Sequence, residues 1–292
     1  MSGADWIAAD WGTSNLRVWA MAGAKPVDHR ASEKGMGALL PDEFAPHLSE
    51  ITADWGPLPV VACGMVGSRQ GWIEAPYRAV PTSAAPHLVR APGDRPVWIA
   101  GGVKQDDPPD VMRGEETQIA GLLARDPEFD GVVCLPGTHT KWVRISAGEI
   151  CFFQSFMTGE LFSLLAKQSV LRHTVGTPDI ADPAFSEAAQ EAMDRPQIAY
   201  GKLFQLRSGA LLGDLAPDTA AARLSGLLVG LELASAKPYW LGQRIAMIGN
   251  DALSAGYEAA LAPMGAMIER YETESVTLAG LTAAWTTLKE TL

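Results

Sequence analysis

The same local pattern occurs twice in this chain: a short apolar run, a polar turn rich in glycine and hydroxyl side chains, and a second apolar run. The first copy extends from Trp6 to Met21 and the second from Gly131 to Ile145. Apolar runs on both sides of a tight polar turn are typical of a β-hairpin. A two-stranded hairpin is not stable alone and needs further elements around it, so the repeat predicts a pair of related domains.

Strands and helices alternate along both halves, which indicates an α/β fold. Further buried strands are expected at Pro59–Gly64, Val97–Gly102 and Arg244–Ile248, and helices at Glu115–Ala124, Glu160–Lys167, Phe185–Met193, Thr219–Ser235, Ala252–Met264 and Leu278–Leu288. Consecutive prolines stop both helices and central strands. Residues 106–110 (Asp-Asp-Pro-Pro-Asp) are therefore interpreted as a linker.

Composition excludes several classes of protein. Hydrophobic residues make up 47% and charged residues 20% of the 292 residues, so the chain can bury a substantial core rather than stay disordered. The formal net charge of −11 repels phosphate backbones and anionic lipid, which argues against a general nucleic-acid or membrane binder. The strongest apolar stretch, Leu224–Ala234, contains Glu232 and is far shorter than the roughly 20 residues of a membrane span.

The amino-terminal segment carries Asp5 where a signal peptide would carry basic residues, so a cytoplasmic location is expected. The three cysteines, Cys63, Cys134 and Cys151, are scattered and odd in number. They are a poor disulfide framework and too few for a thiolate metal cage. We interpret them as small buried apolar side chains.

The familiar nucleotide and hydrolase motifs are absent: there is no P-loop, no Gly-x-Gly-x-x-Gly opening a helix, no His-Glu-x-x-His and no Gly-x-Ser-x-Gly. Residues 10–15 instead offer a carboxylate followed by backbone N–H groups and hydroxyls. Such a turn can hold a hydrated Mg²⁺ beside phosphate oxygens, with Arg17 reaching the same phosphates. The alternative is a turn that satisfies only its own backbone. The similar turn at residues 137–140 favours the first interpretation, since two turns facing each other would grip a polyphosphate.

Two adjacent acids, Glu115 and Glu116, stand at the start of an expected helix, directly after Arg113 and Gly114. Their negative charge at the positive end of the helix dipole is a complete structural explanation. The functional alternative is that one carboxylate accepts a proton from a substrate hydroxyl as a general base. Arg113 would then pair with a substrate anion or with a neighbouring acid.

In this order, the segments resemble the sugar-kinase branch of the actin-like ATPase superfamily. More specifically, the chain resembles the 2-dehydro-3-deoxygalactonokinase family over nearly its whole length. The blocks that carry the resemblance are Ala9–Arg17, Gly64–Ser68, Val111–Gln118, Leu135–Val143 and Phe156–Leu161, with Ile248–Asn250 and Leu278–Leu281. The resemblance implies ATP-dependent phosphorylation of 2-dehydro-3-deoxy-D-galactonate at its C6 hydroxyl, with Mg²⁺.

The resemblance also implies an α/β fold of two ribonuclease-H-like (actin-like ATPase) domains with a central cleft. The first domain is expected at residues 1–110, with a helix at 277–292 packed back on it, and the second at 111–276. Two other readings stay open. One is a kinase of this fold acting on a different sugar or sugar acid, and the other is a nucleotide-operated binding module.

Residue by residue, Asp10 matches the acid that positions Mg²⁺, through water. The general base is expected at Glu116, with Glu115 next, and Asp10 completes the catalytic candidates. Phosphate and adenosine contacts are implied for three loops, whose residues are Gly12, Thr13, Ser14, Arg17, Gly137, Thr138, His139, Gly249 and Asn250. His139 departs from the family pattern, which commonly has glycine or serine there, so it either contacts phosphate or caps the turn.

On the substrate side, either Arg69 or Arg113 is expected to pair with the substrate carboxylate, and Gly67 and Ser68 share the segment that contains Arg69. Gly159 and Glu160 are expected to contact sugar hydroxyls; alternatively, Thr158 caps the following helix and Glu160 lies in its first turn. The expected partners are ATP and a sugar acid, without nucleic acid or membrane. A homodimer is left open.

Overall fold

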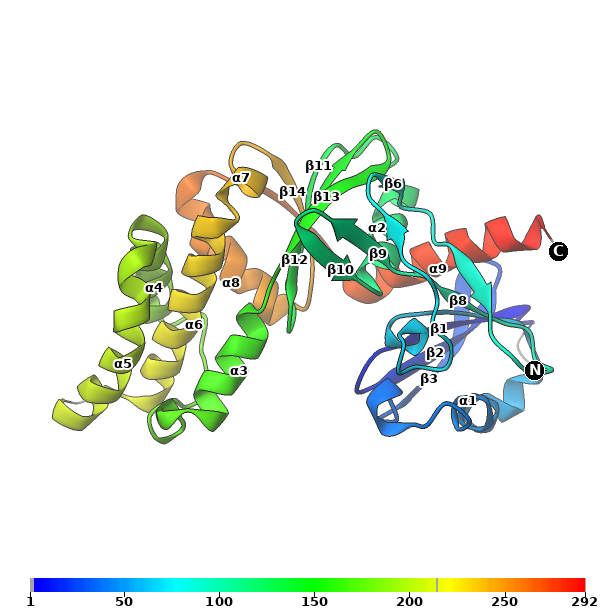
Figure 1. Cartoon of the computed structure of the whole chain (residues 1–292), viewed down its shortest axis with the longest axis horizontal. Helices are drawn as coiled ribbons and strands as arrows, with labels where there is room; N and C mark the ends of the chain where they lie inside the picture. The colour runs from blue at the N-terminus through cyan, green and yellow to red at the C-terminus, as the bar shows by residue number, and fades with distance from the viewer. Residues whose placement is uncertain (1–2, 214, 292) are drawn as a thin grey trace. The chain divides into compact units, whose positions relative to one another are not determined.

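The computed structural model of the chain describes residues 3–213 and 215–291 (Figure 1). These residues form two compact units, each drawn from separate parts of the chain. The first unit takes the described parts of residues 1–130, 145–152 and 272–292, and the second takes residues 131–144 and 153–271. Among the described residues, no helix is both long enough and apolar enough to cross a membrane.

The first unit is built around a six-stranded sheet in the order β3-β2-β1-β4-β8-β7. Its strands are β1 (Trp6–Trp11), β2 (Leu16–Ala22), β3 (Lys25–Ser32), β4 (Val60–Cys63), β7 (Leu88–Arg90) and β8 (Val97–Ala100). β1, β4 and β8 are parallel, whereas β1, β2 and β3 follow one another as antiparallel neighbours. The hairpin predicted at Trp6–Met21 is therefore confirmed.

A smaller sheet of the first unit has the order β10-β9-β5. Its strands are β5 (Arg78–Ala79), β9 (Val103–Asp106) and β10 (Pro109–Met112), while β6 (Thr82–Ser83) pairs with the start of β13 (Glu149–Phe156). The helices of this unit are α1 (Phe44–Ile51), α2 (Glu115–Arg125) and α9 (Thr273–Lys289). Short 3-10 turns cover Met36–Ala38, Ala53–Trp55 and Met65–Gly67.

Strand β1 is buried on both of its faces. Ile7 and Ala9 point into a core that contains Phe44 of α1, whereas Trp6 points into a second core with Trp285 of α9. The rings of Trp6 and Trp285 stack with their centroids 5.4 Å apart. Since neither face meets water, this strand reads as a continuous apolar run rather than as an alternating one.

Helices α2 and α9 cross in contact through two glycines. A Cβ atom built on Gly280 would lie 1.9 Å from the carbonyl oxygen of Thr117, and one on Gly121 would lie 1.8 Å from that of Val276. No real side chain fits at such distances. The two glycines therefore set how closely α9 approaches the helix that begins with Glu115.

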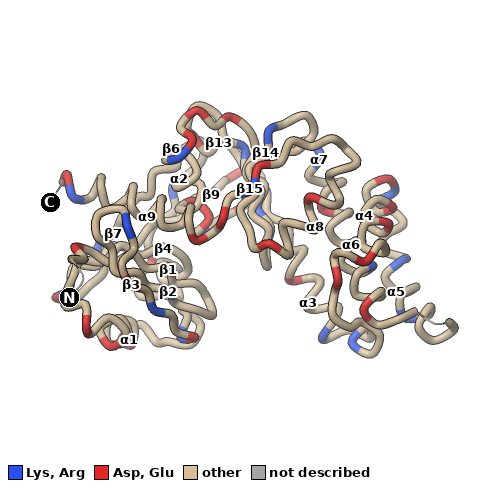
Figure 2. The backbone as a smooth tube through the Cα atoms, turned by 180° about the vertical axis from the view of Figure 1, so that it is seen from behind, with Lys and Arg blue, Asp and Glu red and all other residues tan. Residues whose placement is uncertain are grey.

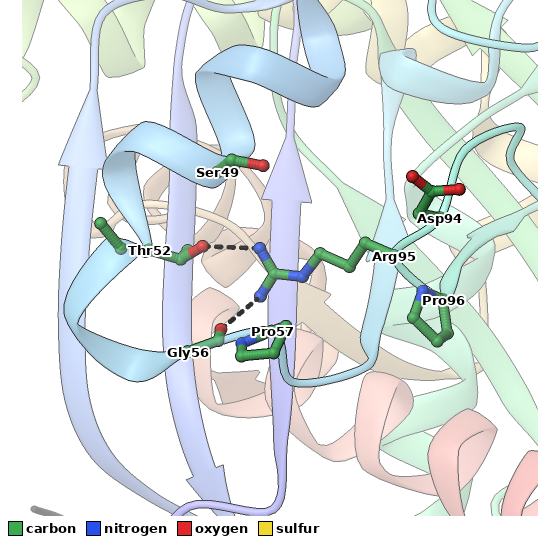
Figure 3. Close-up of a pocket in the computed structure, with 8 residues that line it drawn as sticks. Ser49, Thr52, Gly56, Pro57, Asp94, Arg95 and Pro96 are labelled. Atoms are coloured by element: carbon green, nitrogen blue, oxygen red, sulfur yellow. Dashed lines mark hydrogen bonds between the residues drawn. The ribbon is translucent and has the colours of Figure 1, made fainter.

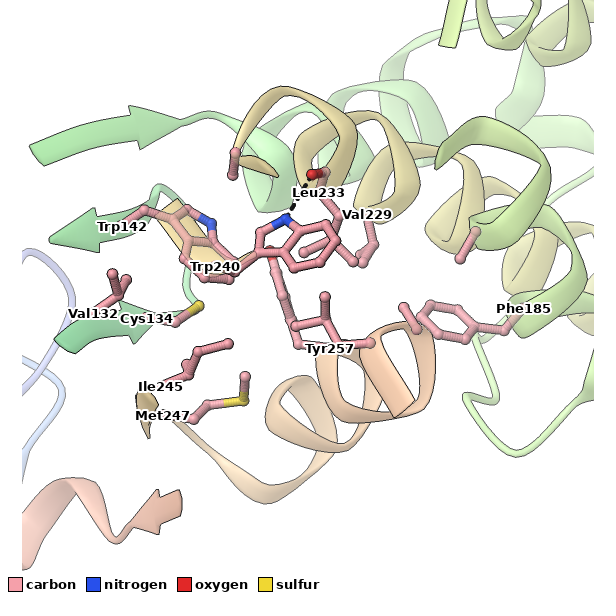
Figure 4. Close-up of a cluster of buried hydrophobic side chains, with 14 of the residues drawn as sticks. Val132, Cys134, Trp142, Phe185, Val229, Leu233, Trp240, Ile245, Met247 and Tyr257 are labelled. Atoms are coloured by element: carbon pink, nitrogen blue, oxygen red, sulfur yellow. Dashed lines mark hydrogen bonds between the residues drawn. The ribbon is translucent and has the colours of Figure 1, made fainter. Parts of the chain in front are cut away.

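The second unit has strands in the order β15-β14-β11-β12, with β13 next to β12. Its elements are β11 (Gly131–Leu135), β12 (Thr140–Ser146), β14 (Arg244–Ile248), β15 (Met267–Tyr271), α3 (Thr158–Gln168), α4 (Pro183–Asp194), α5 (Pro196–Leu212), α6 (Pro217–Ser235), α7 (Lys237–Trp240) and α8 (Asp251–Leu261), with 3-10 turns at Val170–His173 and Ala262–Met264. Figure 4 shows the core of this unit, in which Trp142 and Met247 of the sheet meet Leu233 of α6 and Tyr257 of α8.

Several sequence expectations need correction. Residues 106–110 are not a linker: Asp107 and Pro108 form the tight turn between the antiparallel strands β9 and β10. The prolines fit because Pro109 begins a strand at the edge of its sheet. Cys63 and Cys134 are buried as expected, but Cys151 is partly exposed.

The compact units also differ from the predicted domain division. Residues 111–130, which the sequence reading placed in the second domain, pack in the first unit together with α9. The helix expected at 277–292 starts at Thr273. The division into ribonuclease-H-like domains at 1–110 and 111–276 stays a prediction.

Substituting Gly280 with alanine should lower the free energy of unfolding by about 3 kcal/mol or more, because the new methyl group overlaps the backbone of α2. Gly201→Ala is the matched control, since Gly201 lies inside α5 and nothing lies within 4 Å of its added Cβ. That variant should gain as much as about 1 kcal/mol from helix propensity. Urea unfolding measures both, and equal midpoints would contradict the packing argument.

Candidate active site

The first polar turn places Asp10 near the end of β1, directly opposite Arg17 on β2. The Arg17 guanidinium donates to Asp10 Oδ2 at 2.5 Å, and its other nitrogen lies 3.9 Å from a carboxylate oxygen of Glu274. Burial is the largest single influence on the pKa of Arg17 and lowers it, but the charge and hydrogen bond of Asp10, together with the charge of Glu274, make the net shift upward. Two of the predicted site residues therefore form an ion pair.

The turn itself is supported from beneath by the segment that follows β3. The amide N–H groups of Gly35, Met36 and Gly37 donate to carbonyl oxygens of residues 12–14. A Cβ on Gly35 would lie 2.3 Å from the carbonyl carbon of Ser14, so the segment and the turn are in direct backbone contact. The side chains of Thr13 and Ser14 stay exposed. The turn is therefore held by backbone hydrogen bonds and offers hydroxyls at its surface.

The start of α2 approaches the ends of β1 and β4 through two more glycines. Gly64 has φ +92 and Gly114 has φ +107, both in the region that favours glycine. A Cβ on Gly114 would lie 3.4 Å from the Cα of Gly64, and one on Gly64 would lie 2.8 Å from the carbonyl oxygen of Trp11 and 3.5 Å from Asp10 Oδ1. Gly64 therefore lies close both to the start of the helix and to Asp10.

Glu116 lies in the first turn of α2 with 0% of its surface exposed. Its two oxygens accept hydrogen bonds from the Gly114 N–H at 2.6 Å and the Thr117 hydroxyl at 3.1 Å. Burial, followed by the charge of Glu115, raises the pKa of Glu116 to about 8. Burial and then the charges of Asp10 and Glu116 also raise the pKa of Cys63, which places this thiol near both carboxylates.

The neighbouring Glu115 is only half-buried and accepts a hydrogen bond from the Arg113 backbone N–H at 2.9 Å. Both acids therefore hold amide groups at the start of α2, which is the structural role that the sequence allowed. Glu116 differs from Glu115 because it has lost its hydration. A raised pKa of this origin is frequent at catalytic acids and bases.

The guanidinium of Arg113 is buried, and two of its nitrogens lack a protein partner. The residue is 8% exposed, donates once to the Ala75 carbonyl at 2.8 Å and stacks on the Tyr77 ring at 4.3 Å. Nε and Nη1 have no hydrogen-bond partner, and neither does the buried hydroxyl of Ser68. A Cβ on Gly67 would lie 3.0 Å from Arg113 Nη1. Arg69, by contrast, is exposed.

The second polar turn lies against the start of α3. A Cβ on Gly159 would lie 2.4 Å from the Gly137 carbonyl oxygen, and the Glu160 N–H donates to the Thr138 carbonyl at 2.9 Å. The Glu160 carboxylate lies 2.6 Å from His139 Nε2. The structure thus gives Gly159 and Glu160 a supporting role beneath this turn, while their contact with a sugar stays a prediction.

The third loop lies beside the second turn. A Cβ on Gly249 would lie 3.3 Å from the Pro136 ring and 3.0 Å from the Ser254 hydroxyl. Asn250 caps α8 by accepting a hydrogen bond from the Leu253 N–H at 2.9 Å. The second unit therefore brings residues 137–139 and 249–250 together, as the sequence predicted for a nucleotide site.

A cavity of about 360 Å³ opens next to these loops. Its walls come from the second turn, α3, α6, α8 and the loop before α4, and are mostly apolar. The residues that line it are Gly137, Thr138, Thr158, Gly159, Phe162, Pro178, Ile180, Ser225, Leu228, Val229, Ala252, Leu253 and Tyr257. Apolar walls with a few polar groups at one end are typical of small-ligand sites.

Behind this cavity, Glu232 of α6 is buried. Its carboxylate accepts hydrogen bonds from Trp142, Thr158 and Tyr257. Burial raises the pKa of Glu232, and these three hydrogen bonds oppose the rise. Thr158 therefore does not cap α3 with its side chain, because its hydroxyl is directed at Glu232. Sequence reasoning missed this group, for which the only signal was one acid inside the apolar run at 224–234.

A second pocket of about 430 Å³ lies in the first unit beside the end of α1 (Figure 3). Arg95 crosses it and donates to the Leu58 carbonyl at 2.8 Å, to the Thr52 hydroxyl at 2.7 Å and to the Gly56 carbonyl at 3.3 Å. Because these contacts all tie neighbouring segments together, Arg95 has a structural role. None of the predicted site residues lines this pocket.

The first polar turn has oxygen donors of the kind that Mg²⁺ binds. In the part of the chain that the structure describes, no cluster of three or more His, Cys, Asp or Glu side chains could hold an ion. Mg²⁺ typically takes one or two carboxylates and completes its shell with phosphate and water. Asp10 and the exposed hydroxyls of Thr13 and Ser14 fit that requirement. Figure 2 shows basic residues interspersed with acidic ones in both units.

Comparison with known proteins identifies the family. A model of the 2-keto-3-deoxy-galactonokinase family matches residues 10–284. The chain belongs to this family. It is 37% identical to the probable 2-dehydro-3-deoxygalactonokinase DgoK1 of Rhizobium meliloti, with 96% of each chain covered. It is 36% identical to the 2-dehydro-3-deoxygalactonokinase of Escherichia coli, with 95% of this chain and 96% of the relative covered.

Solved structures agree with the family and the fold. The crystal structure of a Sinorhizobium meliloti protein assigned as a 2-dehydro-3-deoxygalactonokinase has a TM-score of 0.91 and 36% identity, and covers 97% of this chain and 99% of its own. The activator of 2-hydroxyisocaproyl-CoA dehydratase from Clostridium difficile has a TM-score of 0.54 at 11% identity, which shows the fold alone. The predicted family, its kinase class and the actin-like α/β fold are confirmed.

In this galactonokinase-family protein, substituting Glu116 with glutamine should change how stability depends on pH. The pKa of Glu116 is about 8 in the folded state and near 4.5 when unfolded, so between these values only the folded state keeps the proton. The contribution of this proton to stability is complete below about pH 4.5 and is lost as the pH rises through about 8.

Because glutamine does not titrate, the unfolding free energy of E116Q relative to wild type should rise between about pH 5 and about pH 8. The slope is at most about 1.4 kcal/mol per pH unit. Urea unfolding at both pH values measures the effect. Parallel pH curves for the two proteins would show that Glu116 is ionised in the folded state.

Proposed function

We propose that this chain transfers the γ-phosphoryl group of ATP to the C6 hydroxyl of 2-dehydro-3-deoxy-D-galactonate. The observation that carries the proposal is the fully buried carboxyl of Glu116 in the first turn of α2, within residues 10–284 that match the kinase family. An alcohol is a weak nucleophile, and a carboxylate with a raised pKa is suited to take its proton. Phosphoryl transfer otherwise needs mainly position and charge neutralisation.

The nucleotide is assigned to the second unit. The apolar cavity of about 360 Å³ takes the adenosine, beside Gly249 and Asn250. The phosphates extend toward Gly137, Thr138 and His139, where His139 is held by Glu160 at 2.6 Å. The chain's own donors here are backbone N–H groups, a hydroxyl and an imidazole, which suit phosphate oxygens.

Asp10, Thr13 and Ser14 of the first turn are the residues that would hold Mg²⁺, through water and phosphate oxygens. When bound, the ion would neutralise negative charge on the phosphates. Arg17 now neutralises Asp10 at 2.5 Å and is the cation closest at hand for a phosphate. We also propose that the enzyme works in the cytoplasm on small-molecule partners, and a homodimer remains an expectation from sequence.

The acceptor is assigned to the first unit, with Glu116 as general base. The substrate oxygen forms a bond to the γ-phosphorus as the bond from that phosphorus to the β–γ bridging oxygen breaks, and ADP leaves. The hydroxyl proton passes to the Glu116 carboxylate. Because the side chain is fully buried, the hydroxyl must take the place of the Thr117 donor at 3.1 Å.

Arg113 is the residue proposed to hold the substrate carboxylate. Its Nε and Nη1 lack partners although they are buried, and an unpaired buried donor costs about 1–3 kcal/mol. A substrate carboxylate would accept from one of these two donors and leave the other for a second acceptor, and the Ser68 hydroxyl could add a further hydrogen bond. Arg69 is exposed and lacks this support. The geometry therefore favours Arg113 of the two arginines predicted from sequence.

Glu116→Gln should lower kcat by about 100-fold or more, because glutamine cannot accept the hydroxyl proton. Its affinity for ADP should stay within about twofold of wild type, since Glu116 lies in the other unit from the nucleotide residues. A coupled ADP-release assay and calorimetry measure the two effects. Glu115→Gln tests the alternative base: if E115Q loses turnover and E116Q keeps it, the assignment moves to Glu115.

Arg113→Lys should raise the KM for the sugar acid by about tenfold or more while the KM for ATP changes little. Lysine keeps the charge but lacks the fixed planar donors with which the guanidinium stacks on Tyr77 and bonds to the Ala75 carbonyl. The same assay on Arg69→Lys decides between the two arginines. A large rise in KM for R69K, with R113K near wild type, would transfer the carboxylate to Arg69.

A further inference from the structure

Glu232 is a buried acid that the proposed reaction does not use. It lies in α6 and is 3% exposed. Its Oε1 accepts the indole N–H of Trp142 at 2.7 Å, and its Oε2 accepts the hydroxyl protons of Thr158 and of Tyr257, the latter at 2.7 Å. A buried carboxylate is costly unless it is fully hydrogen-bonded, so these four side chains act as one group.

Two of the three donors also line the cavity assigned to the nucleotide. Thr158 and Tyr257 are wall residues, whereas Trp142 is not. Thr158 precedes Gly159, which packs under the second turn, and Tyr257 lies on α8 after the loop at 249–250. One carboxylate therefore links the start of α3 to α8, and both elements border the same cavity. Figure 4 shows Tyr257 reaching from α8 toward the sheet that carries Trp142.

With Glu232 ionised, the chemistry of the partners sets the direction of each proton. An indole N–H can only donate, so Oε1 must accept from Trp142. The Tyr257 hydroxyl has one proton, which goes to Oε2, so the Thr140 hydroxyl at 2.9 Å donates to the Tyr257 oxygen. The Thr158 proton also goes to Oε2. Neither hydroxyl of these two wall residues then has a proton left for the cavity, so either can meet a ligand there only with a lone pair.

We propose that Glu232 is a positioning residue for the nucleotide: it holds Thr158 and Tyr257 in place and turns their hydroxyl protons away from the cavity. The cavity wall then accepts hydrogen bonds from the hydroxyl and amino groups of a bound nucleoside. The proposal rests on the proposed function, in which this cavity takes the adenosine of ATP. Glu232 itself touches neither substrate nor phosphate.

Glu232→Gln tests this role with nearly the same volume. The amide oxygen must face Trp142, which only donates, so the amide NH₂ replaces Oε2. Thr158 and Tyr257 must then accept from this NH₂ and turn their own protons elsewhere. The Kd for ADP, measured by calorimetry on the full chain without sugar acid, should rise about tenfold. The KM for the sugar acid should stay within about twofold.

Trp240→Phe is the matched control for a purely structural effect. The Trp240 indole N–H donates to the carbonyl of Leu233, the residue that follows Glu232 in α6, at 2.8 Å (Figure 4). Trp240 belongs to the same core but does not line the cavity. The W240F variant loses this buried hydrogen bond, so its Tm should be lower than that of wild type. Its Kd for ADP should stay within about twofold of wild type. Tyr257→Phe removes one of the two wall hydroxyls and should weaken ADP binding in the same direction as E232Q.

The outcomes separate the possible roles. Weaker ADP binding in E232Q and Y257F, with W240F near wild type, supports the proposal. A lower Tm in E232Q with unchanged ADP affinity overturns it and leaves Glu232 a structural residue, as does an equal loss in W240F. If E232Q does not fold, the Kd for ADP of Y257F is compared with that of W240F, and weaker binding in Y257F alone supports the proposal. A wild-type chain that fails to bind ADP would overturn the proposed function as well, which distinguishes the two failures.

Discussion

The burial of the Glu116 carboxyl is the feature on which the candidate site in the first unit depends. Glu116 can be buried only because the amide groups at the start of α2 hydrogen-bond to it, and that helix start reaches the strand ends only because Gly64 and Gly114 let two backbones touch. Further along the helix, Gly121 and Gly280 hold it against α9. Backbone contacts of this kind leave little freedom, so the carboxyl keeps its place relative to Asp10 without a flexible side chain between them.

Both units support their polar turns in the same way. In the first, Gly35 packs under Ser14, and in the second, Gly159 packs under Gly137; a Cβ on either would come within 2.4 Å of the turn backbone. A turn that binds phosphate with its own N–H groups must be held without side chains in between. The pattern that repeats in sequence therefore has the same kind of backbone support in both units, although Gly159 lies in the first turn of α3, whereas Gly35 directly precedes the 3-10 turn at Met36–Ala38.

Local sequence pattern was sufficient to predict part of the fold and of the candidate site. The apolar runs and polar turn at Trp6–Met21 are a property of adjacent residues, so the hairpin and Asp10 could be predicted from sequence, as could the start of α2 at the paired acids. Residues 106–110 misled because two prolines suit a tight turn as well as a linker. Tyr77 under Arg113, and the group around Glu232, join elements far apart in the chain. Such contacts depend on tertiary packing, and no periodicity or spacing reports them.

The discontinuous make-up of the first unit has a consequence for biosynthesis. Its central strand β1 comes first in the chain, yet the ring that stacks on Trp6 belongs to α9, which follows every strand of that sheet. Until then one face of the sheet has no cover, and the buried indole has no partner. Nascent chains often finish their amino-terminal part first. Here the first unit cannot be completed before α9 has been made, so the ribosome-bound polypeptide carries an uncovered apolar surface until translation reaches α9.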